Sequence, residues 1–265
     1  MIKIIITGVC GKMGNTILNL ALDDGDFDVV GAVEAQNHPL TGKPLNHILP
    51  NAPAQLSIEG SLANVINKCD VVIDFTEPTV SYEYFKLAKK NFKAMVIGTT
   101  GFSEKVLEEI KRSKTSCKIV ISPNMSIGMN LMFDMVERLS RIMKTDYDIE
   151  ISEMHHRMKK DAPSGTALKL KDIIKSSDNK KNWIEIYGRK GMVGERNKDE
   201  LGIHALRGGD IVGEHTVMFA GIGERLEVTH RAYSRDNFAK GAIIAAKWLY
   251  KQSAGVYSMK DVLEI

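Results

Sequence analysis

The side chains best suited to proton transfer and anion binding gather between Glu153 and Thr166, in the sequence E-M-H-H-R-M-K-K-D-A-P-S-G-T. The imidazoles of His155 and His156 change charge near neutral pH. A lysine crowded by other cations, as Lys159 is in the sequence, loses its proton more readily than a free lysine. Such a segment can bind an anion and pass it a proton. The alternative is a solvated basic loop, and the rest of the chain has to decide between the two.

A second candidate site is a glycine turn near the N-terminus. Apolar residues 2–7 predict a buried parallel strand, followed by G-V-C-G-K-M-G at 8–14 and a helical pattern, and a further strand over 28–34 ends in Glu34. This order indicates a dinucleotide-binding unit, with phosphates at the helix N-terminus and ribose on Glu34. The glycine spacing differs from the usual G-x-G, because Cys10 takes the middle position. A tight turn without a ligand is therefore the alternative, and Cys10 is either a packing residue or an oxidisable thiol.

The composition limits the classes of function. The chain has 265 residues, 43% of them hydrophobic and 26% charged, and its 36 basic and 33 acidic side chains leave a net charge of +3. This balance argues against nucleic acid as the main partner, and no apolar run approaches the ~20 residues that span a bilayer. Three widely spaced cysteines predict a reducing compartment, no disulfide framework and no metal site. We therefore expect a cytoplasmic protein.

The first half of the chain alternates strands with helices. Predicted strands over 69–75, 93–97 and 118–121 alternate with predicted helices over 80–90 and 103–112. This order predicts a right-handed, Rossmann-type parallel α/β sheet in a domain of residues 1–126. Ligands of such sheets bind at the carboxyl ends of the strands. Turn and polar residues lie at these ends, at Gly8, Glu34, Phe75-Thr76, Gly98-Thr99-Thr100 and Ser122 to Asn124.

The second half has a different pattern. A long amphipathic helix over 127–143 precedes a half-buried strand over 147–154 and a helix that starts near Gly165. Further strands are predicted over 183–187, 202–207, 214–220 and 224–229. The alternation predicts an α+β domain over 127–234 with a mixed or antiparallel sheet for substrate binding and oligomerisation. The C-terminal segment 235–265, with a helix over 237–250, is expected to pack back on the first domain.

With these motifs in view, the chain resembles the 4-hydroxy-tetrahydrodipicolinate reductase (dihydrodipicolinate reductase) family of bacterial and plant lysine biosynthesis. The resemblance covers essentially the whole chain. It rests on the residues at 8–14, 98–102 (G-T-T-G-F), 122–126 (S-P-N-M-S), 153–168 and 207–230. It implies a two-domain, usually tetrameric enzyme that uses NADH or NADPH to reduce a cyclic imine dicarboxylate to tetrahydrodipicolinate.

The resemblance also implies roles for matching residues. The pyrophosphate would be held by Gly8, Val9, Cys10, Gly11, Lys12 and Met13, and the ribose by Glu34. The nicotinamide would be flanked by Gly98, Thr99, Thr100, Ser122, Pro123, Asn124 and Met125. His155 would be a proton donor or acceptor, Lys159 a proton donor, and the substrate would be bound by His156, Gly165 and Thr166. A basic loop and a helix N-terminus suit a small heterocycle with two carboxylates.

One departure bears on the cofactor. Many members of the family carry an arginine directly after the ribose-binding acid, where it meets the 2′-phosphate of NADPH. Here that position is Ala35, followed by Gln36. Because Glu34 repels a phosphate, we expect NADH to serve at least as well as NADPH. Lys12, His38 or Lys43 can still assist NADPH binding.

Two other functions fit parts of the sequence. Another Rossmann dehydrogenase acting on a small acid explains residues 1–126 but gives no purpose to the histidine-rich segment. A non-catalytic NAD(H)-binding redox sensor is a second alternative, since a fold does not establish a function. The expected second sheet has one apolar face, and another subunit would cover it most easily. A homo-oligomer is therefore expected, and the resemblance implies a tetramer.

Overall fold

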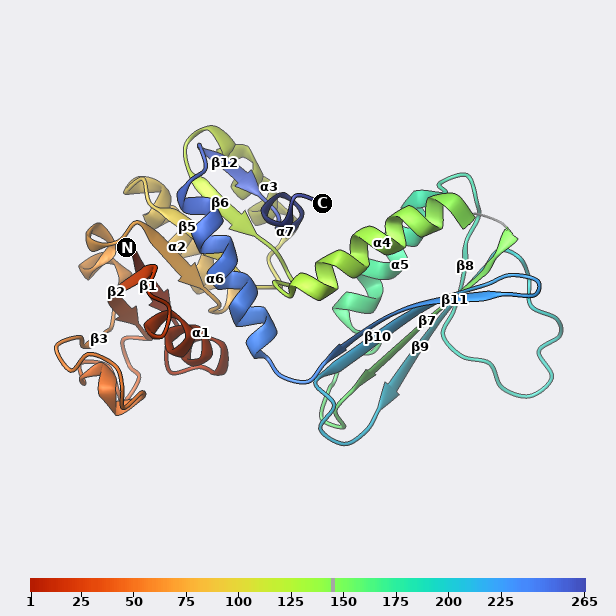
Figure 1. The fold of residues 1–265 in the computed structure, drawn as a ribbon, viewed down its shortest axis with the longest axis horizontal. Helices are drawn as coiled ribbons and strands as arrows, with labels where there is room; N and C mark the ends of the chain where they lie inside the picture. Colours follow the sequence, from red (N-terminus) through yellow and green to blue (C-terminus); the bar gives the residue numbers. More distant parts are fainter. Residues whose placement is uncertain (144–145) are drawn as a thin grey trace. The chain divides into compact units, whose positions relative to one another are not determined.

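The computed structural model describes residues 1–143 and 146–265 and divides the chain into two compact units. The first comprises Met1–Ile127 and Arg235–Ile265, and the second comprises Gly128–Ser234. Each has its own apolar core. Figure 1 traces the elements of both units along the chain.

The first unit is built on a seven-stranded sheet in the order β12-β6-β5-β4-β1-β2-β3, and its described strand pairs are all parallel. The strands are β1 (Ile2–Thr7), β2 (Phe27–Val33), β3 (Ile58–Glu59), β4 (Val71–Asp74), β5 (Ala94–Ile97), β6 (Lys118–Ile121) and β12 (Gly255–Tyr257). The helices are α1 (Lys12–Leu22), α2 (Pro78–Lys90), α3 (Glu104–Arg112), α6 (Asp236–Tyr250) and α7 (Met259–Leu263). The predicted Rossmann-type sheet is confirmed.

Helices cover both faces of this sheet, which explains its continuous apolar strands. In β1, Ile4 and Ile6 pack in the cluster that includes α1 and α6, whereas Ile5 packs in the cluster that includes α2 and α3. All three isoleucines are fully buried. Because neighbouring side chains of a strand point to opposite faces, both faces need apolar residues.

The C-terminal segment contributes more to the sheet than the sequence analysis expects. Helix α6 packs into the core of the first unit, and the segment then adds β12 beside β6. Strand β12 has only three residues. Such a short run leaves almost no alternation for a sequence pattern to reveal.

The second unit has a mixed five-stranded sheet in the order β11-β10-β7-β9-β8. The strands are β7 (Asp148–His155), β8 (Ile184–Ile186), β9 (Glu200–Arg207), β10 (Gly213–Ala220) and β11 (Arg225–Ala232). Strand β10 pairs antiparallel with β7 and β11, and β9 pairs parallel with β7 and β8. The predicted mixed sheet is confirmed.

Two helices of the same unit cover the apolar face of this sheet. Helices α4 (Ile127–Met143) and α5 (Gly165–Ser177) lie along one side of it in Figure 1. Their buried residues, such as Phe133 and Leu170, join one core cluster with sheet residues such as Ile151 and Phe219. The expectation that another subunit covers the apolar face is therefore wrong. The helical periodicity shows that each helix has an apolar stripe, but it does not show which surface the stripe meets.

The polar segment between β8 and β9 is tied to the sheet by ion pairs. Arg189 and Arg196 both contact the carboxylate of Glu150 on β7, at 3.0 Å and 3.1 Å. His204 on β9 contacts the same carboxylate at 2.7 Å. This Glu150 cluster lies on the face opposite to Ile149 and Ile151, since side chains alternate along the strand.

Within residues 1–143 and 146–265, no helix is long and apolar enough to cross a membrane. The same residues contain no group of three or more His, Cys, Asp or Glu side chains arranged to hold a metal ion.

Candidate functional site

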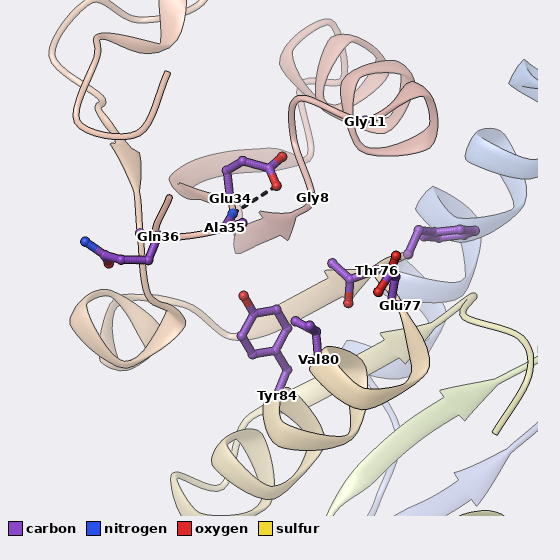
Figure 2. A pocket seen from close by; sticks show the side chains of 11 residues that line it. Gly8, Gly11, Glu34, Ala35, Gln36, Thr76, Glu77, Val80 and Tyr84 are labelled. Carbon is purple, nitrogen blue, oxygen red and sulfur yellow. Dashed lines mark hydrogen bonds between the residues drawn. The ribbon is translucent and has the colours of Figure 1, made fainter. Parts of the chain in front are cut away.

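A pocket of about 710 Å³ opens in the first unit, beside the ends of β1, β2 and β4 (Figure 2). It is lined by Gly8, Gly11, Glu34, Ala35, Gln36, Gly60, Phe75, Thr76, Glu77, Val80 and Tyr84. The predicted residues Gly8, Gly11 and Glu34 are among them. Phe75 and Thr76 are expected from the sequence as strand-end residues, whereas Gly60, Glu77, Val80 and Tyr84 are not predicted.

The glycine turn brings helix α1 very close to the end of β1. Gly8 has φ +65°, a conformation that side-chain-bearing residues rarely adopt. A Cβ placed on Gly14 would lie 2.0 Å from the carbonyl oxygen of Gly8. Both glycines are therefore required by the turn, and the start of α1 comes to lie beside the pocket, where a pyrophosphate would meet free N–H groups.

The carboxylate of Glu34 stabilises this turn. It accepts hydrogen bonds of 2.9 Å from the backbone N–H groups of Cys10 and Ala35, and the second of these is drawn in Figure 2. Burial, together with the neighbouring Glu34 carboxylate, raises the pKa of the Cys10 thiol to about 11. A thiol that stays protonated at neutral pH is a poor nucleophile. This favours the packing role of Cys10 over the redox role.

A buried carboxylate, Asp74, joins the ends of three strands. It accepts hydrogen bonds from the hydroxyls of Thr7 at 2.6 Å, Thr76 at 2.7 Å and Thr99 at 3.1 Å. The Thr99 hydroxyl also contacts the carbonyl oxygen of Thr76 at 2.8 Å. The predicted cofactor residue Thr99 therefore directs its hydroxyl into this network. The sequence signal for Asp74 is an acid inside the apolar run that forms β4, a position where burial requires partners.

The remaining predicted cofactor residues follow β5 and β6. Gly98 lies against the ring of Phe75, since a Cβ there would be 2.1 Å from a ring carbon. After β6, the hydroxyl of Ser122 donates to the carbonyl oxygen of Asn124 at 2.8 Å. Met125 is buried, and its backbone packs directly against Gly241 of α6. A Cβ on Gly241 would lie 1.8 Å from the carbonyl oxygen of Met125. Val9 is fully buried. The residues that do not line the pocket are Val9, Cys10, Lys12, Met13, Gly98, Thr99, Thr100, Ser122, Pro123, Asn124 and Met125.

In the second unit, the histidine-rich segment is organised by Glu153, whose carboxylate is fully buried. Oε2 accepts a hydrogen bond from Arg207 at 2.8 Å and contacts His155 Nδ1 at 2.6 Å. Oε1 accepts hydrogen bonds from Arg207 at 2.9 Å and from the backbone N–H of Ser164 at 3.0 Å. Burial acts to raise the pKa of Glu153, but these hydrogen bonds outweigh it and lower the pKa below its ordinary value. Glu153 is thus a carboxylate at neutral pH.

His155 is held by its Nδ1 atom and carries no hydrogen bond on Nε2 within the described residues. Its ring meets the ring of His215 edge-on, with centroids 5.2 Å apart. Burial lowers the pKa of His155, and the partly opposing effect of Glu153 does not restore it. Gly213 lies next to Nε2, because a Cβ on that residue would be 3.0 Å away. The missing side chain at Gly213 leaves Nε2 uncovered.

Ser164 links this cluster to the start of α5. Its hydroxyl oxygen accepts a hydrogen bond from the backbone N–H of Ala167 at 3.2 Å and so caps the helix. The same oxygen lies 3.1 Å from Nε2 of His215. Burial lowers the pKa of His215 to about 3, so this imidazole is neutral. The backbone N–H groups of Gly165 and Thr166 have no partner within the described residues, as expected for the first turn of a helix.

Lys159 pairs with the carboxylate of Asp161. Its Nζ is 2.8 Å and 2.9 Å from the oxygens of Asp161, whose backbone carbonyl accepts a hydrogen bond from Arg207. Arg207 and Lys159 thus both contact Asp161, one at the backbone carbonyl and one at the carboxylate. His156 lies beside this loop with a buried Nδ1 that has no partner within the described residues.

Comparison with known proteins places both units in one family. The models "Dihydrodipicolinate reductase, N-terminus" and "Dihydrodipicolinate reductase, C-terminus" match residues 2–125 and 128–263. The chain belongs to the dihydrodipicolinate reductase family. The resemblance inferred from the motifs is confirmed.

Relatives in this family match nearly the full chain. The 4-hydroxy-tetrahydrodipicolinate reductase of Syntrophus aciditrophicus is 46% identical over 264 residues, covering 99% of this chain and 98% of the relative. That of Methanocaldococcus jannaschii is 46% identical over 269 residues, covering 99% and 97%. The solved structure of dipicolinate-bound dihydrodipicolinate reductase from Paenisporosarcina sp. TG-14 is 26% identical, with a TM-score of 0.76 and 97% of each chain covered. Amine dehydrogenase from Mycobacterium smegmatis is 11% identical with a TM-score of 0.63, so it shares the fold alone.

The sequence analysis misses Arg207, Gly213 and His215 as site residues of this reductase-family chain. All three lie in the segment 207–230 on which the resemblance rests. Arg207 contacts Glu153, which is 54 residues earlier in the chain, and His215 contacts Ser164, which is 51 residues earlier. Spacing along the chain cannot show such contacts. The sequence offers two signals for this part of the site: a glycine at the start of a strand, and a histidine on the buried face of that strand.

The open position at Gly213 leads to a prediction about His155. In Gly213→Ala, the new Cβ covers Nε2, and the bond to Glu153 hinders the ring from moving away. The rate at which diethyl pyrocarbonate modifies His155, followed by peptide mass spectrometry, should fall several-fold. Gly208→Ala is the matched control, since a Cβ there meets nothing within 4 Å. Equal modification rates in wild type and Gly213→Ala would contradict this view of the site.

Proposed function

We propose that this chain catalyses the NAD(P)H-dependent reduction of 4-hydroxy-tetrahydrodipicolinate to tetrahydrodipicolinate in the diaminopimelate and lysine pathway. Its family membership and its relatives' named activity support this proposal. The observation that carries it is a histidine with an open Nε2 and a fixed Nδ1, beside a helix N-terminus, in a chain that also has a dinucleotide-type pocket.

The first unit fits a nicotinamide dinucleotide. The tight turn at Gly8 and Gly14 suits a pyrophosphate at the start of α1, with Gly8 to Met13 around it, and the Glu34 carboxylate suits the ribose hydroxyls. The residues proposed to flank the nicotinamide are Gly98, Thr99, Thr100, Ser122, Pro123, Asn124 and Met125. When bound, the reduced cofactor supplies a hydride.

The pocket's charge supports NADH as a cofactor that serves at least as well as NADPH. Glu34 and Glu77 both line it, and its described lining contains no lysine or arginine. The 2′-phosphate of NADPH would lie near the ribose-binding acid, where negative charge repels it and no lysine or arginine of the described lining compensates. NADH carries a hydroxyl at that position and avoids this repulsion.

The second unit fits a small dicarboxylate. The open N–H groups of Gly165 and Thr166 can donate to one carboxylate at the positive end of α5. His156 supplies a further polar contact, and Lys159 supplies a positive charge. His155 Nε2 or Lys159 Nζ delivers the proton that completes the reduction, while Nδ1 of His155 stays on Glu153.

A non-catalytic NAD(H) sensor and a different Rossmann dehydrogenase are less favoured. Neither explains why a buried carboxylate holds a histidine with its second nitrogen open. A turnover measurement separates them from the reductase.

The deciding measurement is oxidation of NADH and NADPH, followed by absorbance, with substrate generated from pyruvate and aspartate semialdehyde by the preceding synthase. We expect turnover with both cofactors and a KM for NADH no higher than that for NADPH.

His155→Ala and Lys159→Ala should each reduce kcat by about 10²-fold or more, because each loses a proton donor. Both variants should still bind NADH. Binding of NADH without oxidation by wild type would refute the reductase and favour the sensor.

We also propose a homotetramer, as the family resemblance implies. The second unit exposes large apolar side chains at Ile184, Met192, Val193, Leu206, Ile222 and Leu226. Such side chains on a protein surface often mark association sites. Light scattering should give about four times the mass of one chain, which is 29.4 kDa. A monomer at micromolar concentration would contradict the proposal.

A further inference from the structure

The buried Glu153 carboxylate is placed to control how His155 handles protons. It contacts Nδ1 of His155 at 2.6 Å and receives hydrogen bonds to both oxygens from Arg207. We propose that Glu153 is a positioning residue that keeps a proton on Nδ1 of His155, so that Nε2 is the nitrogen that gives its proton to the substrate. This inference rests on the proposed reductase function.

The chemistry of the four contacts requires a carboxylate at this position. Each oxygen of Glu153 receives two donors: Oε2 from Arg207 and His155, and Oε1 from Arg207 and Ser164. A carboxylate offers enough lone pairs for four donors, whereas an amide replaces one oxygen with an NH₂ group. In Glu153→Gln, the NH₂ group would therefore face two N–H donors and could accept no hydrogen bond from either. The side chain is fully buried, so water cannot replace the lost bonds.

Fixing Nδ1 decides which nitrogen of His155 gives up its proton. The neutral ring, with its proton on Nδ1, first takes up a second proton from water on Nε2, and in this imidazolium both nitrogens carry a proton. When Nε2 transfers its proton to the substrate, the ring's remaining proton stays on Nδ1, where Glu153 accepts it. The ring becomes neutral in the tautomer that the carboxylate stabilises. Without Glu153, the two nitrogens compete for the remaining proton, and the ring is free to turn.

The charged groups around His155 and the neutral imidazole of His215 come from four parts of the chain. Glu153 lies on β7, Arg207 on β9, His215 on β10 and Lys159 in the loop after β7. Burial lowers the pKa of His155, Glu153 raises it, and Lys159 and Arg207 lower it. Removal of Glu153 and removal of Arg207 should therefore shift the titration of His155 in opposite directions. A loss of local structure would not produce opposite shifts.

The same strand provides a matched control. Glu150 also contacts a histidine and two arginines, with His204 at 2.7 Å, Arg189 at 3.0 Å and Arg196 at 3.1 Å. It lies three residues before Glu153, on the opposite face of the sheet. Glu150→Gln therefore removes a similar ion cluster from the same strand without touching His155.

The test compares Glu153→Gln, Arg207→Met and Glu150→Gln with wild type. The titration of His155 is followed by NMR of isotope-labelled histidine, and its signal is assigned by its loss in His155→Asn. We expect wild type to carry the Nδ1–H tautomer. The pKa of His155 should fall in Glu153→Gln, rise in Arg207→Met and stay unchanged in Glu150→Gln. In Glu153→Gln, kcat should drop by about 10²-fold with little change in KM, as for loss of a general acid.

Shifts in the same direction for Glu153→Gln and Arg207→Met, or no shift in either, would overturn the proposal. If Glu153→Gln does not fold, the titration of His155 in Arg207→Met decides the question. An unchanged pKa of His155 in Arg207→Met also overturns the proposal. The NMR result does not require turnover. An inactive wild type with opposite pKa shifts would thus refute the reductase and leave the positioning by Glu153 supported.

Discussion

The second unit depends on one buried charge, the Glu153 carboxylate. A charge without water is tolerated only when donors replace its hydration, and Glu153 obtains them from β7, β9 and the start of α5. These bonds fix His155, the cap residue Ser164 and the direction of α5 together. Breaking such a buried pair from one side typically costs about 3–5 kcal/mol. The geometry of the histidine-rich segment therefore follows from satisfying this carboxylate.

The first unit uses a related arrangement with neutral partners. The buried Asp74 accepts hydrogen bonds from three threonine hydroxyls at the ends of β1, β4 and β5. Hydroxyls do not neutralise a carboxylate as the guanidinium of Arg207 does. Asp74 joins the ends of these strands, whereas Glu34 and Glu77 line the pocket. The two units share a principle, since in each a buried acid near strand ends holds the neighbouring loops in place.

Sequence patterns predict the elements well because those elements depend on local periodicity and turn chemistry. The apolar run at residues 2–7, the glycine turn after it and the helix that starts near Gly165 all appear in the structure as expected. The partners of buried charges could not be predicted in the same way. Arg207 reaches Glu153 across 54 residues, and Thr7 reaches Asp74 across 67. Such contacts arise from strand order, which one sequence does not specify.

The expectation about the second sheet failed for the same reason. The apolar face of that sheet is covered by α4 and α5, because their own apolar stripes pack there. The hydrophobic pattern of each element is correct. Only the folded chain determines which groups meet.

A double-mutant cycle in the single-turnover rate tests whether Glu153 acts on the reaction through His155. Single-turnover rates would be measured for wild type, Glu153→Gln, His155→Ala and the double variant, with NADH and synthase-generated substrate. Residues that act as one unit have non-additive effects. The account predicts that adding Glu153→Gln to His155→Ala causes no further loss of rate. Additive losses would show that Glu153 affects the reaction independently of His155, and would contradict the account.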